Sequence, residues 1–67
     1  MNIELLKQER IKQNITQEEM ATHLGYKDRS SYCQIESGKV KLPIEKIKSV
    51  KEILNLSDEM VGKIFLA

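Results

Sequence analysis

The sequence has few of the residues that cross-link, kink or stack within a protein. Its 67 residues include one cysteine (Cys33), one proline (Pro43), three glycines and no tryptophan. A lone cysteine excludes an internal disulfide, the usual support of a small secreted domain, so we expect a protein of the reducing cytoplasm. The longest apolar run covers only residues 64–67, which is too short to span a membrane. The first residues include Glu4 and lack an apolar segment, so we expect no signal peptide.

The short length limits the architecture further. A chain of 67 residues is near the lower size limit for a core that folds unaided. Because the sequence has no internal repeat and no low-complexity tract, we expect a single domain over residues 1–67. Small domains without disulfides often gain stability by self-association.

The charge is unevenly distributed along the chain. The net charge of +1 is weak evidence for any partner, but residues 27–51 have a local balance of +4, whereas residues 1–26 sum to −1 and residues 52–67 to −2. A basic cluster of this kind also occurs on ordinary solvated surfaces. Here it surrounds a short polar helix expected after residue 28, which favours contact with nucleic acid.

The spacing of apolar residues predicts an all-α fold with five helices. We expect them at about 3–13, 16–25, 28–38, 43–54 and from 57 onward, with no strand. In the fourth helix, four residues at a 3-3-4 spacing are expected to face inward: Ile44, Ile47, Val50 and Leu54. In the third helix, Tyr32 and Ile35 are expected to do so.

The clearest local signals occur in residues 16–38, where two short helices are joined by a tight turn. Thr16 followed by Glu19 is typical of a capping box, in which each side chain accepts a hydrogen bond from an otherwise unpaired amide. Gly25 ends the first of these helices, Asp28 caps the second, and Gly38 ends it. This layout is that of a helix-turn-helix, which places its second helix in the major groove of DNA.

The motif T-Q-E-E-M-A-x-x-L-G, followed by S-x-x-x-x-I-E-x-G-K and a proline, resembles the lambdoid repressor and Cro class, the XRE-type helix-turn-helix family. The resemblance covers about residues 3–66. It implies a compact five-helix, lambda-repressor-like DNA-binding domain whose helix-turn-helix is formed by the second and third helices. It also implies that Arg10 and Glu36 form a partly buried ion pair that aligns the third helix.

The same resemblance implies which residues contact double-stranded DNA. Base contacts are expected from Arg29, Ser30 and Gln34. Phosphate contacts are expected from Gln17, Lys27, Ser31, Lys39 and Lys41. The chemistry agrees, since Arg29 suits guanine O6 and N7, and Gln34 suits adenine. The plainer alternatives are that Gln17 is an exposed helix former, that Arg29 is a solvated charge paired with Asp28, and that Cys33 is a semi-exposed small residue.

Two features depart from the common pattern, and the first of them leaves the register of the third helix open. The turn from Gly25 to Asp28 is one residue longer than in the shortest family members, so either Arg29 or Ser30 is the first base contact. Tyr32 stands where a branched aliphatic residue is usual. We expect its ring in the core and its hydroxyl directed toward the DNA backbone.

Catalysis has little support in the sequence. The single histidine, His23, is expected on the exposed side of its helix, and no glycine-rich phosphate loop or metal-ligand cluster is present. We therefore expect no enzyme, no cofactor, no metal and no small-molecule ligand.

The function that this sequence favours is a phage repressor/Cro-type transcriptional regulator, binding a pseudo-palindromic operator as a homodimer. The dimer contact is expected among apolar residues of the last helix, which alternatively only complete the core: Val61, Ile64, Phe65 and Leu66. The alternative functions are an antitoxin, a restriction-modification controller subunit, or a protein-interaction module with the same fold.

Overall fold

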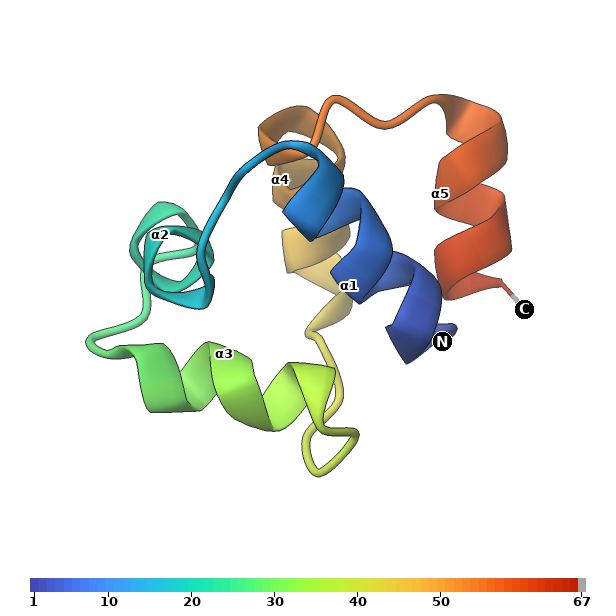
Figure 1. Ribbon diagram of the computed structural model, residues 1–67. Helices are drawn as coiled ribbons and strands as arrows, with labels where there is room; N and C mark the ends of the chain where they lie inside the picture. The colour runs from blue at the N-terminus through green and yellow to red at the C-terminus, as the bar shows by residue number, and fades with distance from the viewer. Residues whose placement is uncertain (67) are drawn as a thin grey trace.

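The computed structural model describes residues 1–66; Ala67, the last residue of the expected domain, lies outside them. The chain folds into five α-helices, with a short 3₁₀ turn, η1, before the fourth (Figure 1). Their bounds are α1 Ile3–Lys12, α2 Gln17–His23, α3 Arg29–Glu36, η1 Ile44–Lys46, α4 Ile47–Ile53 and α5 Asp58–Phe65. Residues 1–66 contain no strand, so the prediction of an all-α fold with five helices is confirmed.

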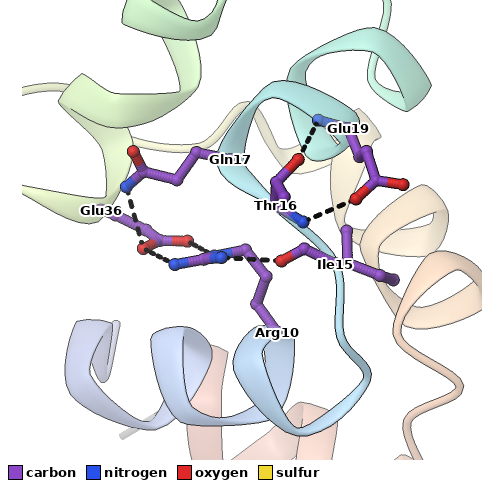
Figure 2. Close-up of polar contacts among 6 residues, drawn as sticks. All are labelled: Arg10, Ile15, Thr16, Gln17, Glu19 and Glu36. Carbon is purple, nitrogen blue, oxygen red and sulfur yellow. Dashed lines mark hydrogen bonds and ion pairs between the residues drawn. The ribbon is translucent and has the colours of Figure 1, made fainter.

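Side-chain caps explain where most helices begin. Asn2, Asp28 and Ser57 each accept a hydrogen bond from a backbone N–H in the first turn of α1, α3 and α5, at 3.0, 3.3 and 3.1 Å. The predicted capping box is present at α2: Thr16 Oγ1 accepts from the Glu19 amide at 3.0 Å, and Glu19 Oε1 accepts from the Thr16 amide at 2.9 Å (Figure 2). Such caps fix a helix start because they satisfy amides that have no partner within the helix.

Left-handed residues end the two helices of the motif. Gly25 after α2 has φ +83° and Gly38 after α3 has φ +82°, a conformation that only glycine adopts without steric cost. At Gly38 the close approach of α1 adds a second constraint, because a Cβ there would lie 3.0 Å from Ile3 Cδ1. The predicted stops at both glycines are therefore confirmed.

The core draws on all five helices. Its ten buried apolar residues are Leu6, Met20, Ala21, Leu24, Tyr32, Ile35, Val50, Leu54, Leu56 and Ile64. The prediction for the fourth helix was wrong at one position, since Ile44 is 81% exposed. Ile44 belongs to η1, one turn before α4, where nothing in the described chain covers it. Val50 and Leu54, the last two of the four residues expected to face inward, are completely buried.

The arrangement leaves α3 on the outside of the molecule (Figure 1). α3 contacts α2 and α1, while α5 packs against α1 on the side away from α2. A backbone hydrogen bond of 2.6 Å from the Asn2 amide to the Ile64 carbonyl joins the start of the chain to α5. No helix within residues 1–66 is long and apolar enough to cross a membrane.

Candidate nucleic-acid interface

α3 has one buried face and one polar exposed face. Tyr32, Ile35 and Glu36 are buried toward the core, as predicted for the first two. The three residues expected to contact bases, Arg29, Ser30 and Gln34, are all exposed. Cys33 and Ser31 are half-buried beside them. The structure therefore brings the expected base-contacting residues together on one surface.

The N-terminal end of α3 is organised by Asp28. Its Oδ1 accepts a hydrogen bond from the Ser30 hydroxyl at 2.7 Å and from the Ser31 amide at 3.3 Å. These two hydrogen bonds lower the pKa of the Asp28 carboxyl below its usual range. Ser30 thus uses its hydroxyl hydrogen within the protein and offers its oxygen to solvent. Arg29 takes part in none of the ion pairs of residues 1–66, so the alternative pairing with Asp28 is not observed.

Arg10 and Glu36 meet in a buried, bidentate contact between α1 and α3 (Figure 2). Arg10 Nε lies 2.6 Å from Glu36 Oε2, and Arg10 Nη2 lies 3.2 Å from Glu36 Oε1. Arg10 Nη1 also donates to the Ile15 carbonyl at 2.7 Å. The two side chains are only 10% and 3% exposed. This contact fixes the C-terminal end of α3 against α1 and against the segment that leads into α2.

Gln17 is a third partner in this network, which the sequence did not indicate. Its Nε2 donates to Glu36 Oε1 at 3.2 Å, so α2 is connected to the same carboxylate (Figure 2). Burial raises the pKa of Glu36, but the hydrogen bonds from Arg10 and Gln17 and the positive charge of Arg10 outweigh it, and the net pKa is lowered. Glu36 is therefore held as a carboxylate that three helices share.

Tyr32 differs from its expected role. The residue is completely buried, so the prediction that its hydroxyl is directed toward the DNA backbone was wrong. Within residues 1–66, the hydroxyl oxygen has no hydrogen-bond partner. Burial and the facing Glu36 carboxylate raise the pKa of Tyr32 far above its usual range. The ring fills the core beneath α3 as expected, at a position where a branched aliphatic residue is usual.

The basic residues around α3 fall into two groups. Lys27, Lys39 and Lys41, expected at phosphates, are exposed. The Lys39 and Val40 amides both donate to the Gln34 carbonyl, at 3.0 and 3.2 Å, so this loop folds back on the end of α3.

Two other lysines of the same basic segment have partners within the protein. Lys51 pairs with Asp58. Lys46 donates to the Leu24 carbonyl at 2.6 Å. The positive charge that faces solvent near α3 is therefore smaller than the sequence count of residues 27–51 implies.

The expected dimer residues on α5 differ widely in exposure. Ile64 is completely buried in the core, which corrects its expected place in a dimer contact. Its side chain packs inward, in the helix that completes the core. Val61 and Phe65 are half-buried, and Leu66 is 86% exposed. Phe65 also lines a shallow cavity of about 240 Å³ together with Met1, Lys41, Leu42 and Ile47.

The remaining candidates for chemistry lie apart. His23 is exposed and Cys33 is a half-buried free thiol. Within residues 1–66, no group of three or more His, Cys, Asp or Glu side chains is placed to hold a metal ion.

Comparison with known proteins agrees with this geometry. A family model described as helix-turn-helix matches residues 6–61, which is most of the chain and includes all of α2 and α3. No curated protein and no solved structure matches the chain. The match includes α2, α3 and α4 in full and parts of α1 and α5, and the all-helical fold agrees with a lambda-repressor-like domain. The chain therefore belongs to the XRE/Cro-type helix-turn-helix family of DNA-binding regulators.

Proposed function

We propose that this protein is a transcriptional regulator of the phage repressor/Cro type that inserts α3 into the major groove of an operator. The main support is the exposed polar face of α3, where Arg29, Ser30 and Gln34 lie opposite the buried Tyr32 and Ile35. The major groove of B-DNA is about 12 Å wide and admits one α-helix. Arg29 would bond guanine O6 and N7, and Gln34 would bond adenine N6 and N7.

Phosphate contacts on both sides of α3 would fix the protein on the duplex. The exposed Lys27 precedes α3, and Lys39 and Lys41 follow it, so the DNA backbone would meet positive charge at both ends of the helix. Ser31, also expected at a phosphate, lies in the first turn of α3. Gln17 donates one amide hydrogen to Glu36, and its second N–H would contact a phosphate. Such contacts position a protein without selecting sequence.

The operator would be pseudo-palindromic and bound by a homodimer in the cytoplasm, without a cofactor or small-molecule ligand. Two half-sites one helical turn apart, about 34 Å, suit a two-fold dimer of a domain this size. The exposed Leu66 with the half-buried Val61 and Phe65 is the apolar surface that supports such a dimer.

An antitoxin or a restriction-modification controller subunit would use the same surface, and a protein-interaction module would use the same fold. The exposed cations beside α3 favour DNA over a purely protein-binding role, because the latter has no need of positive charge there.

The proposal is tested by comparing Arg29→Ala with Lys41→Ala on operators selected from random DNA by the wild-type protein. Arg29→Ala should cost about 1–3 kcal/mol on the preferred site and relax the sequence preference, because one base contact is lost. Lys41→Ala should weaken binding about equally on all sequences and reduce the slope of log affinity against log salt by about 1.

Lys7→Ala is the matched control, since it removes one exposed positive charge from α1. It should change neither the sequence preference nor the salt slope. If Arg29→Ala weakens every sequence equally, Arg29 does not contact bases. A wild-type protein that selects no sequence from random DNA would contradict the proposed function and favour the protein-interaction alternative.

A further inference from the structure

The long turn between α2 and α3 is held by a residue that is distant in the sequence. Lys46, at the end of η1, donates from Nζ to the Leu24 carbonyl at 2.6 Å. The same Nζ lies 5.0 Å from the centre of the Tyr26 ring. Leu24 is the C-cap residue of α2, and Tyr26 lies in the turn. Lys46 therefore contacts the turn at two successive points.

The two contacts of Lys46 are with a backbone carbonyl at the end of α2 and with the face of an aromatic ring in the turn. The last carbonyls of an α-helix have no partner within the helix, and a cation there also interacts favourably with the helix dipole. The backbone of the turn already pairs the Gly25 amide with the Thr22 carbonyl at 3.1 Å, and the Tyr26 amide with the Ala21 carbonyl at 2.9 Å. Among the hydrogen bonds of residues 1–66, the Leu24 carbonyl is paired with Lys46. Lys46 thus completes the C-terminal cap of α2.

The position of Lys46 is complementary to that of the Arg10–Glu36 pair. Arg10 holds Glu36, the last residue of α3, whereas Lys46 holds the turn that leads into Arg29, its first residue. α3 is therefore anchored at both ends by side chains from outside the helix-turn-helix. The N-terminal end of α3, next to the turn that Lys46 holds, carries Arg29 and Ser30.

We propose that Lys46 is a positioning residue for base recognition: by holding the turn at residues 24–26 it sets the placement of Arg29 and Ser30, and it does not itself contact phosphate. The inference rests on the proposed function of α3 as the base-contacting helix. Lys46 is half-buried, and its ammonium group is bonded to Leu24 and lies over Tyr26. Lys48, two residues later, is exposed and has no such partner within residues 1–66.

The test replaces Lys46 with methionine, which keeps the apolar stem and removes the ammonium group. Binding is measured on the preferred site and on random-sequence DNA at several salt concentrations. Lys46→Met should weaken binding to the preferred site by about 5–100-fold, the loss expected when a bidentate base contact is misplaced. Affinity for random DNA and its salt slope should stay unchanged, because no phosphate contact is removed.

Three further variants separate positioning from general stability. Lys46→Arg keeps the cation and a donor for the Leu24 carbonyl, so it should retain most of the wild-type preference for the preferred site over random DNA, unlike K46M. Lys48→Met removes a neighbouring charge and should leave the preference intact. The triple variant K46M/R29A/S30A should bind the preferred site no more than about twofold more weakly than R29A/S30A, because Lys46 acts through Arg29 and Ser30.

An unchanged preference in K46M would overturn the proposal. A loss from K46M that persists in full in the R29A/S30A background would also overturn it. Equal weakening on all DNA with a flatter salt slope would also overturn it, since Lys46 would then be a phosphate contact. A wild-type protein without sequence preference would reject the proposed function together with this inference. A wild-type preference that K46M retains would reject the role of Lys46 alone.

Discussion

Replacing Arg10 with methionine should destabilise this fold more than replacing Arg10 and Glu36 together. Arg10 donates at 2.6 and 3.2 Å to Glu36 and at 2.7 Å to the Ile15 carbonyl, and methionine makes none of these bonds. Within residues 1–66, Glu36, whose side chain is 3% exposed, would keep only Gln17, at 3.2 Å, as a hydrogen-bonded side-chain partner. Stranding a buried charge in this way costs about 3–5 kcal/mol.

The double variant R10M/E36M removes both charges and leaves apolar side chains of similar length. Replacing a buried ion pair with packed apolar groups is often neutral. Here the Ile15 carbonyl and the Gln17 amide lose their partners, so we expect a loss of about 1–3 kcal/mol. The double variant should therefore be more stable than R10M, although it carries one more substitution.

Urea unfolding followed by far-ultraviolet circular dichroism measures these differences. A domain of this size has about 3–10 kcal/mol of stability, so R10M should be near the limit of folding and is measured in a stabilising osmolyte alongside the wild type. Lys12→Met, an exposed cation on the same helix, is the control and should change stability by no more than about 0.5 kcal/mol.

The reasoning would be refuted if R10M lost less than about 1 kcal/mol, since the pair would then behave as an ordinary surface contact. It would equally be refuted if the loss in the double variant equalled the sum of the two single losses, because independent residues add and a shared buried contact does not.

Two further predictions concern acid stability and assembly. Because the pKa of Glu36 is lowered in the folded state, the unfolded chain binds this proton more readily, and the stability that the carboxylate provides is present above its ordinary pKa of 4.5 and lost as the pH falls below it. Chemical unfolding at several pH values should therefore show that the free energy of unfolding falls more steeply between about pH 5 and 3 for the wild type than for E36Q. Equal pH dependence in the two proteins would contradict this prediction. Sedimentation with operator DNA should find two protein chains per duplex. Leu66→Glu should weaken this assembly, because it places a charge on the apolar end of α5 that is proposed to form the dimer. A wild type that remains monomeric both free and on DNA would reject the homodimer.

Features with a local cause were predictable from the sequence. The capping box at Thr16 and Glu19 and the stops at Gly25 and Gly38 each depend on a few neighbouring residues, and all are present. The buried face of α3 followed from helical spacing, because Tyr32 and Ile35 lie three residues apart.

Features that depend on contacts distant in the chain were not predictable. Nothing local distinguishes Lys46, which caps α2 from 22 residues away, from the exposed Lys48. Gln17 was expected at a phosphate or as an exposed helix former, because its contact with Glu36 exists only once α2 and α3 are packed. Periodicity likewise shows that Ile64 shares a face with other apolar residues of α5, but not that this face packs on α1 instead of a partner.

The hydrogen bond between the Asn2 amide and the Ile64 carbonyl has a consequence for biosynthesis. α5 leaves the ribosome after the other four helices, yet it supplies a completely buried residue to a core that begins with Leu6. At about 5–20 residues per second, the roughly 27 residues between Gly38 and Phe65 take about 1–5 s to translate. During that interval α1, α2 and α3 exist without the helix that closes their core. The nascent chain should therefore acquire its affinity for DNA only after α5 has been synthesised.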